Sequence, residues 1–295
     1  MSLQSRLYRK STESRIFDTA IIIVLGIYAF LTLYPLIYVI VQSMTSAFDP
    51  NPYYYLWPVK PQFWAYTGAL RTAGLGRAYL NTIIISVGGT ILTLVITLIT
   101  AYPLTVEKLP FRRFLMFAIT FTMLFSGGMI PFYLQVKNLK LMDTYWAIIL
   151  PGAVSAWNII VMRTYMMSNI PREMSEAASI DGAGYWLVLI RIVTPLCKPI
   201  MAVISLFTAV GLWNSYFGPM IFLNRRDLFP LALLLREIVA SRMASGNVDL
   251  ALQTTVTPTA LRSALIIISI APIMCVYPFL QKYFTQGIML GSLKG

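Results

Sequence analysis

The sequence predicts an all-α integral membrane protein with six transmembrane helices. Of its 295 residues, 58% are hydrophobic and only 12% are charged, whereas soluble domains carry about 25% charged residues. Six apolar stretches are each long enough to cross a bilayer, because a helix of about 20 residues spans the roughly 30 Å of hydrocarbon. A soluble core of this size could not bury so much aliphatic surface, so most of the chain is expected to face lipid.

The first apolar stretch, residues 16–42, follows a basic segment and superficially resembles a signal peptide. It is too long for the apolar part of a signal peptide and lacks a small-residue cleavage site, so we interpret it as an uncleaved first span. The other five stretches share its apolar character, and they are residues 78–104, 112–135, 144–167, 196–222 and 260–281. We therefore expect an N-terminal segment (1–15), a transmembrane domain (16–281) and a C-terminal tail (282–295).

The segments that join the spans differ in character. Residues 43–77 are rich in Tyr and Trp, which favour the membrane–water boundary, and residues 223–259 form a second long polar segment. Residues 105–111 make a short turn, whereas residues 168–195 form a longer polar loop with a helical pattern of its own. An even number of spans puts both termini on one side, and the distribution of Lys and Arg favours the cytoplasm for that side.

Two polar features within the spans leave alternatives open. In the second span, threonines recur at intervals of three, four and three, which places them on one helix face; they are Thr90, Thr93, Thr97 and Thr100. This face either packs against another helix or lines a solute path. The run from Gly127 to Pro131 either forms a hinge in the third span or simply ends it, because Gly pairs and Pro weaken helices.

The fifth span contains the run Trp213-Asn214-Ser215-Tyr216. Aromatic faces at this position could stack on a sugar ring, but Trp and Tyr also form belts near the membrane surface. The sequence leaves both interpretations open. We treat Trp213, Asn214 and Tyr216, together with Asn158 of the fourth span, as candidates for the solute path.

Composition argues against several functional classes. The chain has no His and only two Cys, Cys197 and Cys275, which argues against imidazole chemistry, metal sites and a disulfide framework. Proton-coupled carriers usually need ionisable pairs inside their spans, and the spans have none at their centres. The net charge of +12 comes from cations lying singly or in pairs between apolar runs, which fits anionic lipid rather than nucleic acid.

The loop after the fourth span predicts a short surface helix. Pro171 suits a first helical turn, and Glu173 and Glu176 suit the positive end of a helix. Ala177 and Ala178 are small and favour helix, and the glycines at 182 and 184 can end it. Such a helix either docks in a groove of another protein or is a plain solvated connector.

This loop resembles the EAA loop of ATP-binding-cassette (ABC) importer permeases. The resemblance rests on Glu176-Ala177-Ala178, Asp181-Gly182-Ala183, Ile192 and Pro195, with Thr194 where the family usually has Leu. In that family the loop forms a coupling helix that inserts into a cytoplasmic ATPase. The resemblance therefore implies the type I importer permease fold, with ATPase-coupling roles for Glu176, Ala177, Ala178, Asp181, Gly182 and Ala183.

Other segments resemble the second permease of maltose-type, carbohydrate-uptake systems. They are Tyr34-Pro35-Leu36, Asn81-Thr82, Trp213-Asn214 and the tail from Gln281 to Phe284 with Gly287 and Lys294-Gly295. The runs Gly127 to Pro131 and Pro151 to Asn158 are most similar to the subgroup for poly- and oligosaccharides, which includes alginate-type importers. In the maltose-type system the tail reaches into the ATPase pair, which implies contacts there for Gln281, Lys294 and Gly295.

The resemblance implies a multi-pass permease subunit that imports a carbohydrate, in one subgroup an alginate-like one, across the bacterial inner membrane. The implied partners are a second permease subunit, an ATPase dimer and an extracytoplasmic solute-binding protein. ATP and Mg²⁺ would be bound by the ATPase, because this chain has no Gly-rich phosphate loop; it would itself be neither an enzyme nor a cofactor protein. A secondary carrier for a polar solute, or an ABC importer for a solute other than a sugar, remain the alternatives.

Overall fold

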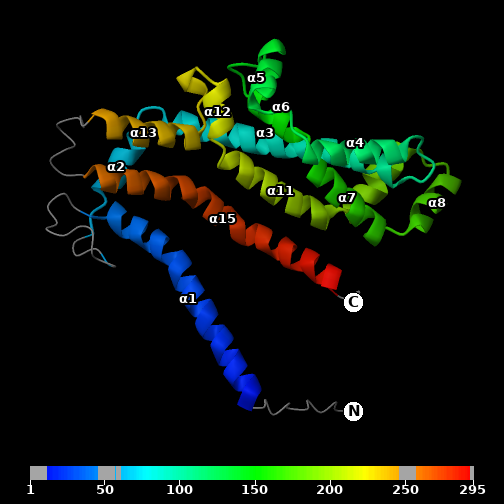
Figure 1. The fold of residues 1–295 in the computed structure, drawn as a ribbon, viewed down its shortest axis with the longest axis horizontal. Coiled ribbons are helices and arrows are strands. Elements are labelled where there is room, and N and C mark those ends of the chain that lie inside the picture. The colour runs from blue at the N-terminus through cyan, green and yellow to red at the C-terminus, as the bar shows by residue number, and fades with distance from the viewer. Residues whose placement is uncertain (1–11, 46–56, 58–60, 246–256, 293–295) are drawn as a thin grey trace. The chain divides into compact units, whose positions relative to one another are not determined.

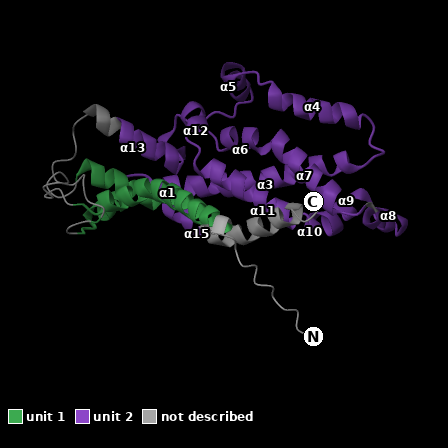
Figure 2. Ribbon diagram, turned by 60° about the horizontal axis from the view of Figure 1, so that its bottom comes forward, with its two compact units in different colours: residues 1–71, 247–268 green, residues 72–246, 269–295 purple. Residues whose placement is uncertain are grey.

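The computed structural model describes residues 12–45, 57, 61–245 and 257–292, and every regular element in these ranges is a helix. Figure 1 shows the order of the helices along the chain, and Figure 2 shows its division into two compact units. One comprises residues 1–71 and 247–268, and the other residues 72–246 and 269–295. Helix α15 (Pro258–Ser292) contributes residues to both units.

The first unit contains the long helix α1 (Thr12–Ser43) and the short helix α2 (Trp64–Leu70). Ser43 and Tyr66 share a hydroxyl–hydroxyl hydrogen bond of 2.6 Å, and the Gln62 amide donates to the Met44 carbonyl at 3.0 Å. These bonds fasten the start of α2 to the end of α1. The apolar side chains of α1 between Ile16 and Tyr34 are exposed, as expected of a helix whose solvent is lipid.

The second unit is organised around α3 (Leu75–Ala101), which extends into a 3₁₀ turn, η1 (Pro103–Thr105). Helix α11 (Lys198–Trp213), α6 (Trp146–Ala153) and α7 (Ala156–Asn169) pack against α3. The other elements of this unit are α4 (Arg112–Leu124), α5 (Met129–Asn138), α8 (Arg172–Ile180), α9 (Tyr185–Val188), η2 (Leu189–Val193), α10 (Thr194–Leu196), α12 (Phe217–Phe222), η3 (Arg226–Leu228) and α13 (Leu231–Ser245).

Three of the six expected spans correspond to long helices, and the other three to bent pairs. By length and composition, α1, α3 and α15 can each cross a membrane. The pairs α4–α5, α6–α7 and α9/α10–α11 pass the same test together, with bends of 114°, 43° and 77°. In the part of the chain that the structure describes, up to six spans are therefore present if each bent pair counts as one.

The bends interrupt three of the six expected spans. Between α4 and α5 the backbone is not helical, and Gly128 has φ 86°, a conformation that favours glycine; the run from Gly127 to Pro131 thus marks a sharp break. The expected fifth span, 196–222, bends at Cys197 and is interrupted again after Trp213 before α12 begins. Pro199 lies two residues after Cys197, in the first turn of α11, where its missing amide is harmless.

Candidate functional site

Helix α8 presents an exposed face at the end of α7 (Figure 1). Glu173, Glu176 and Ala177 are exposed, and Ile180 is 87% exposed. An isoleucine this open at a helix end is unusual in a soluble environment, because burying it is worth about 1.5–3 kcal/mol. The exposed face therefore combines acidic residues, a small residue and one large apolar residue.

Glycine 182 ends α8 in a way that other residues could not adopt without strain. Gly182 has φ 83°, in the left-handed region. The Ala183 amide donates to the Ala178 carbonyl at 2.8 Å, and the Gly182 amide to the Ser179 carbonyl at 3.1 Å. This pair of bonds is the Schellman motif, which satisfies carbonyls at the end of a helix. The prediction that a glycine ends this helix is confirmed at Gly182.

The opposite side of α8 rests on a packed base. Ala178 and Ala183 are half-buried against a hydrophobic cluster drawn from α3, η1, α7, α9, η2 and α11. The cluster includes the fully buried side chains of Met162 and Cys197 and nearly buried Val193. Of the six residues predicted to couple to an ATPase, Ala178 and Ala183 thus face the protein, whereas Glu176, Ala177, Asp181 and Gly182 face outward.

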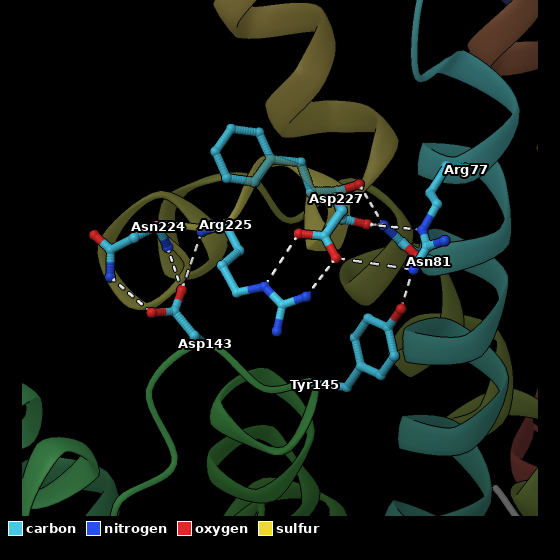
Figure 3. Close-up of polar contacts among 8 residues, drawn as sticks. Arg77, Asn81, Asp143, Tyr145, Asn224, Arg225 and Asp227 are labelled. Atoms are coloured by element: carbon cyan, nitrogen blue, oxygen red, sulfur yellow. Dashed lines mark hydrogen bonds and ion pairs between the residues drawn. The ribbon is translucent and has the colours of Figure 1, made fainter.

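A second polar site, which we call the polar clasp, holds residues 224–231 against the first turns of α3 and the residues before α6 (Figure 3). The Asn81 Nδ2 donates to the carbonyls of Asp227 at 2.8 Å and Phe229 at 3.0 Å. The Tyr145 hydroxyl donates to the Asn81 Oδ1 at 2.8 Å. Asn81, 2% exposed, therefore has its side-chain amide satisfied on both sides, as a buried amide requires.

Two carboxylates complete the polar clasp. Asp143 accepts from the amides of Asn224 and Arg225 at 2.5 and 3.1 Å, and from the Asn224 side chain at 3.1 Å. These bonds, led by the one from the Asn224 amide, hold the pKa of Asp143 below its ordinary value. The Arg225 guanidinium donates to Asp227 at 2.7 and 3.2 Å and lowers the pKa of that carboxyl. Both side chains are partly exposed to solvent, which limits what these pairs contribute to stability.

Sequence reasoning did not single out Asp143, Asn224 or Asp227. Asn81 and Thr82 were noted only for their resemblance to a family pattern, and the structure gives both a local reason. The Thr82 hydroxyl accepts from the Leu231 amide at 2.8 Å, across 149 positions of sequence. The sequence did contain one signal for this site. Asn81 and Thr82 are adjacent polar residues at the start of an apolar span, where each needs a hydrogen-bond partner.

The four candidates for the solute path lie on two elements. Trp213, Asn214 and Tyr216 gather at the end of α11, whereas Asn158 lies in the first turn of α7. The Trp213 indole donates to the Ser269 carbonyl at 3.3 Å, and its ring meets Tyr79 edge-on, with centroids 6.4 Å apart. The Arg236 guanidinium lies 5.4 Å from the centroid of the Tyr216 ring. The indole N–H of Trp213 is thus already engaged within the protein.

The threonines of α3 were expected either to pack against another helix or to line a solute path, and the structure places them in different surroundings. Thr93 and Thr97 are 1% and 0% exposed, and Thr93 donates to the Gly89 carbonyl of its own helix. These two residues lie on a packing face. Thr90 donates to the Ser86 carbonyl and lines an apolar cavity of about 350 Å³ between α3, α11 and α15. Helices α3 and α11 approach closely at Gly89, where an added Cβ would overlap the Leu212 side chain of α11.

None of the three tail residues with predicted ATPase contacts has a described side chain. Gln281 lies in α15, but its side chain is outside the described residues, as are Lys294 and Gly295. Among the described residues, no group of His, Cys, Asp and Glu could hold a metal ion.

Comparison with known proteins defines the class to which this fold and loop belong. Residues 86–290 match the family of binding-protein-dependent transport system inner membrane components. The chain belongs to this family, and it is a transporter permease of the type I importer fold with membrane-spanning helices.

Individual relatives narrow the class. The chain is 39% identical to protein LplC of Bacillus subtilis (strain 168), over 95% of this chain and 96% of LplC. It is 36% identical to the polygalacturonan/rhamnogalacturonan transport system permease protein YtcP of the same organism, over 96% of this chain and 100% of YtcP. A solved structure of a bacterial ABC transporter involved in the import of the acidic polysaccharide alginate has a chain similar to this one. The TM-score is 0.86 and the identity 36%, over 93% of this chain and 98% of that chain.

Proposed function

We propose that this chain is one of two permease subunits of an ABC importer that carries an oligo- or polysaccharide, of the alginate or polygalacturonan kind, into the cell. The names of YtcP and of the alginate transporter support a polysaccharide-derived solute. The observation that carries the importer function is α8: an exposed helix with an acidic, apolar face, ended by a Schellman motif and set on a packed base.

In this proposal α8 docks in a groove of a separate ATPase that binds ATP and Mg²⁺. Ile180 and Ala177 fill the groove, and Glu176 contacts cations at its edge. A helix that binds in a groove is recognised through anchor side chains three or four positions apart, as Ala177 and Ile180 are. The base beneath Ala178 and Ala183 joins α8 to six other helical elements, which are α3, η1, α7, α9, η2 and α11. Displacement of α8 by the ATPase therefore reaches the spans as a rigid movement, by which they alternate between inward-open and outward-open states.

The opposite end of the transmembrane helices faces the solute-binding protein in this proposal. Residues 224–231, fixed by the polar clasp, lie at that end together with α12 and α13. Both termini and α8 are then cytoplasmic. The solute enters between the two permease subunits, and the tail residues Gln281, Lys294 and Gly295 approach the ATPase.

The proposed docking is tested by replacing an isoleucine on α8, with a second isoleucine as control, and by reversing the charge at Glu176. Ile180→Ala should weaken docking of the ATPase about tenfold or more, because most of the buried apolar side chain is lost. Ile190→Ala is the matched control, since Ile190 is 63% exposed on η2, outside α8. Glu176→Lys should abolish solute uptake while the protein remains in the membrane. The measurements are vanadate-sensitive uptake in cells and the amount of ATPase that co-purifies with this chain.

Normal uptake and co-purification with Ile180→Ala and Glu176→Lys would overturn the docking role of α8. Uptake that resists vanadate and follows an ion gradient would instead identify a secondary carrier.

A further inference from the structure

An apolar cavity of about 370 Å³ lies at the end of α3, beside the residues that follow α8. One wall comes from Tyr102, Pro103, Val106 and Leu109, at and after the end of α3. The other wall comes from Tyr185, Trp186 and Leu189 of α9 and η2. The cavity therefore bridges the turn after the second span and the stretch that leaves the α8 loop.

The lining of this cavity suits one kind of ligand. Nearly all of it is aliphatic or aromatic, and its cation is Lys108. The lining offers too few hydrogen-bonding groups for a sugar. A free phosphate would lose its hydration in this apolar space without compensating contacts. Tyr185 and Trp186 are 68% and 63% exposed, and such amphipathic rings favour the boundary between hydrocarbon and headgroups.

Positive charge gathers beside the cavity. Arg112 lies two residues after Pro110, which lines the cavity. The Arg112 guanidinium contacts the Met167 sulfur at 3.9 Å. Arg163, one helical turn before Met167, donates to the Leu104 carbonyl at 3.0 Å. The two guanidiniums therefore share one face of α7.

No carboxylate is paired with these cations in the described ranges. No ion pair is recorded for Lys108, Arg112 or Arg163 there. Glu107 is the acidic residue next to them in sequence, and it has an interaction of its own. The positive charge next to the cavity is therefore not neutralised by a carboxylate within these ranges.

We infer that this cavity binds one acyl chain of an anionic phospholipid, whose phosphate lies against Lys108 with Arg112 beyond it. An acyl chain fits an apolar space of this volume, and basic residues beside such spaces between helices bind anionic headgroups. The inference uses the proposed function only to place this end of the spans in the cytoplasmic leaflet. Because one wall follows α8 directly, the lipid holds the exit of the α8 loop against the end of α3.

The test is lipid binding to the whole transporter, purified through a tag on this chain. Native mass spectrometry and thermal melting are measured with phosphatidylglycerol and with phosphatidylcholine of identical acyl chains. The wild type should bind phosphatidylglycerol more tightly. Lys108→Gln should weaken phosphatidylglycerol binding about fivefold, the effect of one basic residue near an anionic surface, and leave phosphatidylcholine unchanged. Val106→Trp, which fills the cavity, should remove tight binding of both lipids.

Lys137→Gln is the matched control, because Lys137 is exposed in the last turn of α5 and is not part of the cavity. It should bind both lipids as the wild type does. Equal affinity of the wild type for the two lipids, or an unchanged preference in Lys108→Gln, would overturn the inference even if Val106→Trp failed to fold. Glycerol phosphate alone should not bind; if it bound as tightly as the lipid, a free anion would be the ligand. No ATP or solute is present, so failure of lipid binding and failure of the proposed import function give separate results.

Discussion

Two neighbouring glycines of the α8 loop carry different constraints. Gly182 has φ 83°, whereas Gly184 has φ −73°, which any residue can adopt. Neither position has an atom within 4 Å of an added Cβ. Any difference between substitutions at these positions therefore reports backbone conformation alone.

Gly182→Ala should destabilise the end of α8 by about 1–2 kcal/mol, the cost of left-handed backbone for a residue with a Cβ. Gly184→Ala is the control and should be neutral or slightly stabilising, because it reduces the freedom of the unfolded chain. Hydrogen exchange of the Ala183 amide measures the effect directly, since that amide closes the Schellman motif. Equal exchange in the two variants would contradict the assignment of strain to Gly182.

At the scale of elements, Gly89 of α3 marks a close contact between helices in the second unit. An added Cβ there overlaps Leu212 of α11, and one at Gly152 of α6 would lie 3.9 Å from the same side chain. Leu212 of α11 therefore packs against both α3 and α6. Gly88 is next to this site, but its Cβ would lie at an ordinary 3.7 Å from Ile149.

Gly89→Ala should destabilise the protein by about 1–3 kcal/mol, the usual cost of overpacking. Gly88→Ala should be neutral or stabilising, because alanine favours helix by about 1 kcal/mol over glycine. Thermal melting in detergent measures both. In a Leu212→Ala background the penalty of Gly89→Ala should disappear; a penalty that persisted there would show that Leu212 is not its cause.

At the scale of the whole molecule, the proposed topology puts α8 and α5 on opposite sides of the membrane. It is tested by introducing one exposed cysteine at a time after replacement of exposed Cys275 by Ser, with Cys197 left in place because it is buried. An impermeant maleimide should label Lys137→Cys in intact cells, but Ser179→Cys only after permeabilisation. Both positions are exposed. Labelling of Ser179→Cys in intact cells would place α8 outside and end the importer proposal.

Much of the architecture follows from the sequence because apolar length alone predicts a span. The six expected stretches overlap helices or bent pairs, and Gly182 ends α8 as its type and position predicted. The break at Gly128 falls in the run from Gly127 to Pro131, where the sequence predicted a hinge or an end, but the bend at Cys197 could not be predicted because it depends on packing as well as on local preference. The polar clasp was equally hidden, since Asn81 finds its partners 64 and 146 positions away.

The break after α4 also has a consequence for the surrounding bilayer. Helix α4 has 13 residues, none of them buried, and the chain then turns by 114° into α5. Thirteen residues rise about 20 Å, well short of the roughly 30 Å of hydrocarbon. Lipids beside α4 must thin or tilt to match it, at a cost of a fraction of a kcal/mol per ångström. We therefore expect short acyl chains to collect along this side of the molecule.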